Sequence, residues 1–244
     1  MKERSVIILL IFVFSVCLCL SLNNISENIM LTHKSVRSVF NSDTVIIDAG
    51  HGGEDGGAVA PDGTMEKDIN LSICNKLALI FELFDFDYIL IRNTDCSVGD
   101  NSLNTIRQRK NSDILKRFEI INNTPNSILL SIHQNFFSVE KYYGTQVFYA
   151  PDCDISYNLA MCLQNSIAGN LQPENKRKIK ESNKSIYLLY NAVRPSVLVE
   201  CGFLSNSNEL SKLKNEQYQC QLAYFITSGL VEFLYSQKEN VYGK

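Results

Sequence analysis

Two of the three histidines in this chain stand where predicted β-strands end. His51 follows closely on the apolar run 44–47, and His133 directly follows the run 128–132. His33 lies instead in a polar stretch, away from any predicted strand, and is not expected to bind metal. Imidazole nitrogen is a common zinc ligand, so the two strand-end histidines indicate a metal site.

Two glutamates complete the set of side chains that could do chemistry. Glu66 opens the helix that is predicted after His51, and Glu200 ends the apolar run 197–199. Two histidines and one carboxylate make three zinc ligands and leave a position open for water, which is typical of catalytic sites. The other glutamate would be free to transfer protons, so the four residues indicate a hydrolase with one Zn2+ per chain. Asp55 is a rival for the third ligand position.

The segments that would position these residues alternate between strand and helix patterns. Strands are predicted at residues 44–48, 87–92, 127–132, 144–150 and 196–200, with a short edge strand at 185–190. Helices are predicted at residues 67–84, 106–122, 155–168 and 216–235. This alternation predicts a single-domain α/β fold, a three-layer sandwich with a mostly parallel central sheet flanked by helices. Ligands of such sheets bind beyond the carboxyl ends of the strands, so His51, His133 and Glu200 are expected to converge.

The bulk composition fits one globular domain with an N-terminal extension. The chain has 244 residues and a formal net charge of -3, which gives no support for nucleic-acid binding. Basic residues gather at 107–110 and 176–180, and solvated helix faces or loops are the favoured interpretation. Arg92 is expected to be a structural ion-pair partner. The glycine-rich stretch 50–57 lacks the third glycine of a dinucleotide-binding loop, and its two acidic residues would repel phosphate.

The N-terminal residues predict a targeting segment. Residues 5–22 are almost uninterrupted apolar residues, enough for a spanning helix. No Ala-x-Ala cleavage site follows, which favours a signal anchor over a cleaved signal peptide for residues 1–22. A linker is predicted at 23–42, the catalytic domain at 43–237 and a tail at 238–244. Either kind of segment would place the domain outside the cytoplasm, anchored to the membrane or secreted.

Of the eight cysteines, those outside the apolar N-terminal segment are scattered over positions 74, 96, 153, 162, 201 and 220. None forms a Cys-x-x-Cys pair, so a zinc knuckle is not indicated. Free thiols are favoured over a disulfide framework, because Cys74 and Cys162 fall on apolar faces of predicted helices. Cys201 is a weak candidate nucleophile, since no spare histidine remains to activate it.

Four short motifs stand in order along the chain. They are Asp48-Ala-Gly-His-Gly-Gly53, Met65-Glu-Lys-Asp-Ile-Asn-Leu71, Ser131-Ile-His-Gln-Asn135 and Val197-Leu-Val-Glu-Cys-Gly-Phe-Leu-Ser-Asn206. Taken together, they resemble the type 3 class of zinc-dependent N-acetylmuramoyl-L-alanine amidases, and most of all its germination-specific, spore-cortex members. The stretch 105–117 is similar to the segment that precedes the second histidine in those amidases.

The resemblance implies a role for each residue of the site. His51, Glu66 and His133 would bind zinc, and Glu200 would be the catalytic carboxylate. Zinc would polarise the amide carbonyl and lower the pKa of water. Glu200 would take the water proton and deliver it to the departing alanine nitrogen.

Two departures from the family pattern concern substrate contacts. The family often has Pro where Ala49 stands, and a basic residue is common near Tyr190, whereas here Arg194 lies a few residues further on. Candidates for contacting substrate or supporting the site are Asn135, Arg117 and Arg194.

The resemblance also implies a substrate and a setting. The enzyme would cut the amide between N-acetylmuramic acid and L-alanine in peptidoglycan, and a separate deacetylase would act downstream to form muramic-δ-lactam in spore cortex. An accessory lipoprotein is a further expected partner, and the expected location is the intermembrane space of the developing spore. The rival interpretations are a non-catalytic peptidoglycan-binding module and a zinc peptidase that acts within stem peptides. Because all four site residues are present, an enzyme is favoured over the binding module.

Overall fold

The computed structural model describes the backbone of residues 44–242 and the side chains of residues 44–237. The predicted signal segment at 1–22 and the predicted linker at 23–42 lie outside the described residues. Among the described helices, none combines the length and the apolar character that crossing a membrane requires.

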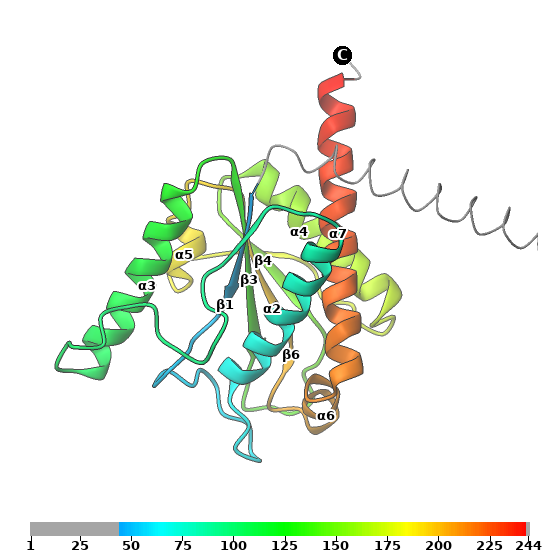
Figure 1. Ribbon diagram of the computed structural model, residues 1–244. Coiled ribbons are helices and arrows are strands. Elements are labelled where there is room, and N and C mark those ends of the chain that lie inside the picture. Colours follow the sequence, from blue (N-terminus) through cyan, green and yellow to red (C-terminus); the bar gives the residue numbers. More distant parts are fainter. Residues whose placement is uncertain (1–43, 243–244) are drawn as a thin grey trace, which may run out of the picture. The chain divides into compact units, whose positions relative to one another are not determined.

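A six-stranded sheet forms the centre of the domain (Figure 1). In spatial order its strands are β2 (Tyr88–Leu90), β1 (Thr44–Ala49), β3 (Ser127–Asn135), β6 (Ser196–Phe203), β4 (Gln146–Tyr149) and β5 (Lys180–Glu181). Neighbouring strands pair in parallel except β4 and β6, which are antiparallel. The central strands β1, β3 and β6 are buried over most of their length, which is why each contains a short apolar run.

Helices cover both faces of this sheet. One face carries α2 (Glu66–Leu83), α4 (Asp154–Asn170) and α7 (Glu216–Tyr242), and α7 packs against the other two. The opposite face carries α3 (Ile106–Asn123) and the one-turn helix α5 (Tyr187–Tyr190), on the left in Figure 1. The short α6 (Ser207–Leu213) follows β6. The predicted three-layer α/β sandwich with a mostly parallel sheet is therefore confirmed.

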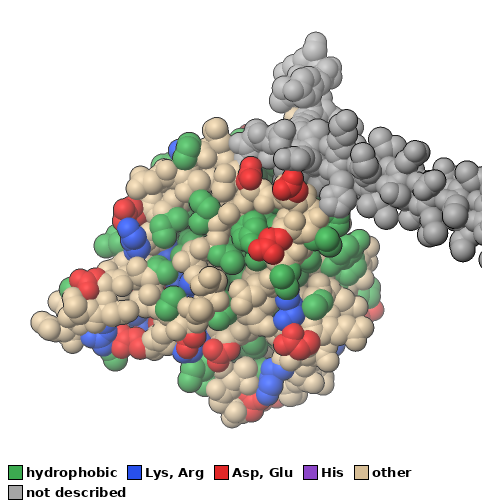
Figure 2. All heavy atoms as spheres, viewed as in Figure 1, with side chains coloured by type: hydrophobic (Ala, Val, Ile, Leu, Met, Phe, Trp, Pro, Cys, Tyr) green, Lys and Arg blue, Asp and Glu red, His purple; other side chains and the backbone are tan. Residues whose placement is uncertain are grey.

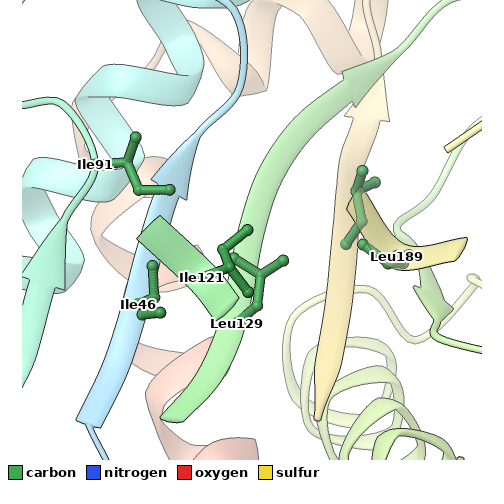
Figure 3. Close-up of a cluster of buried hydrophobic side chains, with 6 residues drawn as sticks. Ile46, Ile91, Ile121, Leu129 and Leu189 are labelled. Atoms are coloured by element: carbon green, nitrogen blue, oxygen red, sulfur yellow. The ribbon is translucent and has the colours of Figure 1, made fainter. Parts of the chain in front are cut away.

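The sheet face beneath α3 and α5 changes character along the strands. Nearer the strand starts it is apolar, and Figure 3 shows Ile46 and Leu129 of the sheet close to Ile121 of α3, with Leu189 of α5 further across the sheet. Because side chains on one face recur at every second residue, the next positions on this face can be read from the sequence. They are Asp48 on β1, Ser131 and His133 on β3, and Glu200 on β6. The strand pattern thus brings polar side chains to the carboxyl ends of three adjacent strands.

Acidic, basic and apolar side chains are interspersed on the face of the domain seen in Figure 2. The basic cluster 107–110 lies on a largely exposed face of α3, as the sequence indicated, and two of its residues also form ion pairs. Arg109 Nε lies 2.5 Å from Glu54 Oε1, and Lys110 Nζ lies 2.7 Å from Asp55 Oδ1. These ion pairs tie α3 to the glycine-rich loop after β1.

The edge of the sheet differs from the sequence prediction. Residues 185–190, predicted as an edge strand, contain α5 instead, and the edge strand is β5 at Lys180–Glu181. Leu189 is fully buried in the cluster beneath α5. A short apolar run of this kind fits a helical turn as well as a strand, so periodicity alone could not decide between them.

Two further helices depart from expectation. The sequence analysis missed α6, although Asn206 caps it by accepting hydrogen bonds from the backbone N–H groups of Asn208 and Glu209. Asn at this position is a recognised N-terminal signal, but a helix of seven residues is too short for its apolar period to stand out. α7 runs on to Tyr242, beyond its predicted end at residue 235 and into the predicted tail.

The six cysteines of the domain are all free thiols, and Cys74 and Cys201 are buried. Burial holds the pKa of the Cys201 thiol well above its usual value. Since the thiolate is the nucleophilic form, Cys201 is a poor candidate for covalent catalysis.

Candidate active site

His51, Glu66 and His133 converge at the carboxyl end of the sheet. His51 follows β1, His133 lies on β3, and Glu66 is the first residue of α2. One potential ligand atom from each residue lies within 4.8 Å of the others. Glu66 faces both rings: its Oε1 is 2.9 Å from His133 Nδ1 and its Oε2 is 3.2 Å from His51 Nε2. Two nitrogen donors and one carboxylate thus surround a space suited to a single cation.

Two glycines leave the room that this convergence needs. A Cβ atom at Gly50 would lie 2.3 Å from the ring of His133. A Cβ atom at Gly57 would lie 2.6 Å from both Glu66 Oε2 and His51 Cδ2, and Gly57 has a φ of +67°. His51 itself has a φ of 63°, a region that side-chain-bearing residues seldom adopt. Its conformation must therefore be held by its surroundings.

Two buried arginines hold the backbone around His51. Arg117 donates to the carbonyl oxygens of Ala49 at 2.9 Å and His51 at 2.7 Å. Arg92 donates to the carbonyls of Ala49 at 2.8 Å and Gly50 at 3.0 Å. Both guanidinium groups are thus engaged with the backbone that carries the first imidazole. Arg117, a candidate for contacting substrate or supporting the site, contacts this backbone and is also among the residues that line the cleft described below.

Asp48 supplies the counter-charge for Arg117. The two side chains form a buried ion pair, and Ser131 Oγ donates to Asp48 Oδ2 at 2.6 Å. Asp113 Oδ2 accepts a further hydrogen bond from Arg117 Nε at 2.6 Å. Burial alone would raise the pKa of Asp48, but the guanidinium and the hydroxyl outweigh burial and hold the pKa below its usual value. The pair is therefore ionised at neutral pH, inside the fold and beneath the site.

Glu66 is held as an anion. Its Oε2 accepts a hydrogen bond from the backbone N–H of Ala58 at 2.9 Å, and its Oε1 accepts one from that of Gln134 at 3.0 Å. Asn70 Nδ2 donates to Oε1 at 3.3 Å. Burial would raise the pKa of Glu66, but hydrogen bonds from the two imidazoles outweigh it and hold the pKa far below its usual range. A permanently charged oxygen donor of this kind suits a metal ligand.

Asp55, the rival third ligand, lies on the far side of the first imidazole. Its Oδ2 is 2.9 Å from His51 Nδ1, while Nε2 of the same ring faces Glu66. Lys110 contacts the other oxygen of Asp55. A carboxylate on the second ring nitrogen of a histidine ligand fixes the orientation and the tautomer of the ring. Asp55 therefore supports His51 rather than joining the three converging residues.

Glu200 stands beside His133 on the neighbouring strand, where the two residues are register partners. Its Oε2 is buried, and no hydrogen-bond partner reaches it from the described part of the chain. Burial raises the pKa of Glu200 to about 7, although the nearby imidazole of His133 opposes the rise. A carboxyl group whose pKa lies near neutrality can both accept and donate a proton at working pH.

These side chains open into a cleft of about 360 Å³. Its lining includes His51, Glu66, His133 and Glu200, together with Lys110 and Asp113 of α3. Apolar residues also line the cleft, among them Ile114, Ile186, Tyr187, Leu188 and Leu198. A ligand in the cleft would therefore meet both charged groups and apolar side chains, most of the latter from residues 186–188 at α5.

The two other candidates for substrate contact do not line this cleft. Asn135 ends β3 next to a register shift, and its carbonyl oxygen accepts a hydrogen bond from Leu204 N–H at 2.8 Å. Arg194 precedes β6, and its Nε is buried without a hydrogen-bond partner in the described structure. Asn135 therefore contacts Leu204 through its backbone, and neither Asn135 nor Arg194 lines the cleft.

Several supporting residues were missed by the sequence analysis. Asn70 bridges the carbonyl of Gly50 at 3.2 Å and the carboxylate of Glu66. Its spacing of four residues from Glu66 puts both on one helix face, which was a usable signal. Gln134 acts through its backbone N–H, and Lys110 acts through Asp55 across a long loop, so neither role was visible in the sequence.

With this geometry in place, comparison with known proteins identifies the family. Residues 45–232 match the sequence model of a family described as N-acetylmuramoyl-L-alanine amidase. The chain belongs to this family. A germination-specific N-acetylmuramoyl-L-alanine amidase of Bacillus subtilis is 31% identical over 189 residues, which cover 78% of this chain and 78% of the relative.

Solved structures of amidases share the fold. The CwlD amidase of Clostridioides difficile, solved in complex with the GerS lipoprotein, is 42% identical with a TM-score of 0.76 and covers 79% of this chain and 98% of its own. The amidase AmiC2 of Nostoc punctiforme is 29% identical with a TM-score of 0.66 and covers 80% and 98%. The resemblance inferred from the four motifs and the assignment to an amidase enzyme class are both confirmed.

Proposed function

We propose that this amidase is zinc-dependent and hydrolyses the bond between N-acetylmuramic acid and L-alanine in the peptidoglycan of spore cortex. One observation carries the proposal: three metal-ligand side chains converge beside Glu200, whose buried oxygen has no hydrogen-bond partner in the described structure. The arrangement matches a catalytic zinc site, with three protein ligands and a proton-transfer group next to an open position.

The donor set fits zinc. His51 and His133 offer ring nitrogens, and Glu66 offers an oxygen that is held ionised. The carboxylate of Asp55 behind His51 is the outer support that zinc-bound imidazoles usually have. When bound there, zinc supplies Lewis acidity for the amide carbonyl and makes water a stronger acid.

Glu200 performs the proton transfers in this proposal. In its ionised form it removes a proton from the attacking water, and it then donates that proton to the alanine nitrogen as the amide bond breaks. Its pKa of about 7 suits both steps, because neither form is strongly favoured at neutral pH. Arg117 and Arg92 take no part in the chemistry and keep His51 in position through the backbone.

The cortex assignment and the partners rest on the relatives. The Bacillus subtilis relative is named as germination-specific, and the Clostridioides difficile neighbour is described with a lipoprotein. By analogy, we infer that this chain also works with an accessory lipoprotein, upstream of a deacetylase that acts on the bared muramic acid. We retain residues 1–22 as a signal anchor or signal peptide, which would place the enzyme in the intermembrane space of the developing spore.

A digest of purified cortex peptidoglycan by the full chain tests the reaction. The proposal expects free N-terminal alanine on released peptides and muramic acid without peptide, with no products from Glu200→Gln. New amino groups within the stem peptides would indicate a zinc peptidase instead. Binding to the sacculus without any released product from the wild type would indicate a non-catalytic module. Loss of activity on zinc removal and its recovery on zinc addition test the metal.

A further inference from the structure

Part of the lining of the active-site cleft takes no part in the chemistry proposed above. It is apolar, and it comes from α3 and α5, which lie together on one face of the sheet (Figure 1). Ile114 belongs to α3, and Ile186, Tyr187 and Leu188 are the N-terminal cap and first residues of α5. The three candidate metal ligands and the proton-transfer glutamate line the same cleft. A molecule that fills the cleft therefore contacts both the site and this α3–α5 surface.

Tyr187 is the residue of this segment that the core does not take up. Leu189 is fully buried, and Ile186 and Leu188 pack against the same buried cluster. Tyr187 in contrast is 38% exposed and lines the cleft. Hydrophobic and aromatic side chains that line a cleft are the usual contact surface of a small-molecule site. The ring of Tyr187 is therefore available to a ligand.

The ring of Tyr187 is also held in one orientation. Phe118 of α3 packs against it edge to face, with 5.5 Å between the ring centroids and an interplanar angle of 67°. Ile114 precedes Phe118 by four residues, so the two share one face of α3. A side chain that is already positioned by its neighbours loses little further entropy when a ligand binds to it.

The charged residues that α3 contributes to the cleft are already paired. Lys110 Nζ lies 2.7 Å from Asp55 Oδ1, and Arg117 Nε donates to Asp113 Oδ2 at 2.6 Å. The α3–α5 surface thus offers a ligand an aromatic ring and aliphatic side chains beside charges that have their own partners. This combination fits an uncharged group with an apolar face and polar edges.

We propose that Tyr187 stacks on the sugar ring of the substrate, with Ile114 beside it, so that the α3–α5 surface binds the muramic acid side of the scissile amide. This inference rests on the proposed amidase function. The family description gives the two groups that the amide joins, which are an N-acetylmuramoyl group and L-alanine. With its carboxyl group in the amide, the N-acetylated sugar carries no charge. Its ring presents C–H bonds on its faces and oxygens at its edge.

The size of the surface favours the sugar over the alanine. L-Alanine offers a single methyl group, which cannot cover a tyrosine ring and three aliphatic side chains together. Small-molecule pockets have volumes of about 300–1,000 Å³. The cleft of about 360 Å³ therefore has room for one sugar ring and the amide.

Two synthetic substrates test the proposal on the full chain loaded with zinc. Both carry the same L-alanyl peptide, which is acylated either by N-acetylmuramic acid or by 2-methoxypropanoic acid, so that the second keeps the ether oxygen and lacks the sugar. The wild type should favour the muramoyl substrate. Tyr187→Ala should reduce this preference by about 5- to 30-fold in kcat/KM, mainly through KM of the muramoyl substrate, which is the scale of burying part of an aromatic ring. Tyr187→Phe should keep the preference, because it keeps the ring.

Tyr190→Ala is the matched control. Tyr190 ends the same one-turn helix and is 39% exposed, but it does not line the cleft. It should keep the wild-type preference.

Three results would overturn the inference and leave the amidase function standing. They are equal cleavage of both substrates by the wild type, an unchanged preference in Tyr187→Ala, and an equal loss on both substrates in Tyr187→Ala, which would mean that Tyr187 acts through the fold. A preference lost in Tyr187→Phe as well would assign the contact to the hydroxyl group and overturn the stacking. No cleavage of either substrate by the wild type would contradict the amidase function itself.

Discussion

Replacing Arg117 by glutamine should destabilise the fold beneath the site, because it leaves the buried carboxylate of Asp48 without its counter-charge. The side chains of Arg117 and Asp48 are only 3% and 1% exposed. Removing one partner of a buried ion pair costs about 3–5 kcal/mol. The carbonyl of His51 also loses its donor, at about 1 kcal/mol or more, whereas the carbonyl of Ala49 keeps the hydrogen bond from Arg92. We expect a loss of about 4–6 kcal/mol in the free energy of unfolding at pH 7.

The pH dependence of this loss separates an electrostatic cause from a packing defect. In the wild type the pKa of Asp48 is depressed, so the pair stabilises the fold above the usual aspartate pKa and is lost only as the pH falls through the depressed value. In Arg117→Gln the buried, unpaired Asp48 should instead have a raised pKa, because burial is then unopposed. Its penalty is relieved when Asp48 takes up a proton. The stability difference between the two proteins should therefore be greatest near pH 7 and should shrink toward pH 4.5.

Urea unfolding of both proteins between pH 7.5 and 4.5, in the presence of a chelator, measures this difference. Asp48→Asn in the Arg117→Gln background removes the orphaned charge and should recover part of the lost stability at pH 7. Lys116→Gln is the control, since Lys116 forms only an exposed pair with Glu119 on the same helix. A destabilisation that stays constant with pH, or a double variant no more stable than Arg117→Gln, would refute the reasoning.

The remaining predictions concern the metal. Glu66→Gln should lose zinc, because a neutral amide replaces an anionic ligand, whereas Glu200→Gln should keep zinc and lose about two to four orders of magnitude in kcat. Zinc content and amide cleavage, measured on both variants, check these two predictions. If Glu200→Gln loses zinc and Glu66→Gln keeps it, the two roles are exchanged. Asp55→Asn should weaken zinc affinity by about 10- to 100-fold, measured by chelator competition, with Glu54→Gln as the control. Equal zinc affinity in the two variants would contradict the role of Asp55 in supporting His51. Gly50→Ala should displace the second imidazole and abolish zinc binding with little change in circular dichroism.

The central strands could be predicted because strands that are buried on both faces contain runs of consecutive apolar residues. β1, β3 and β6 each contain an apolar run of three or more residues, and each run is followed closely by a polar residue of the site. The edge of the sheet contains no such run. β5 has two exposed residues, Lys180 and Glu181, and its strand conformation depends on pairing with β4 rather than on its own composition.

The candidate site residues that converge could be picked out because strand ends and helix starts can be located from the sequence. The residues that support them come from distant segments, and only tertiary packing brings them together. Arg117 lies 66 positions from His51 along the chain, and it contacts a backbone carbonyl. Every residue carries such a carbonyl, so the sequence does not reveal the contact. Arg177 lies in the basic cluster 176–180, for which solvent exposure was the favoured interpretation. In the fold it donates a hydrogen bond to Gln146, which is the register partner of Glu200.

The contrast between Glu66 and Glu200 shows how position in the fold separates two identical side chains. Glu66 accepts hydrogen bonds from two backbone N–H groups, which stabilise its charge and oppose protonation. Glu200 has a buried oxygen without a partner in the described structure, so its charged form is disfavoured and its pKa rises to about 7. When environments push the pKa values of two neighbouring carboxyls apart, the group with the low value suits a permanently anionic role and the group near neutrality suits proton transfer. The division of labour that we propose between ligand and general base follows from this difference, which no property of either residue in the sequence could supply.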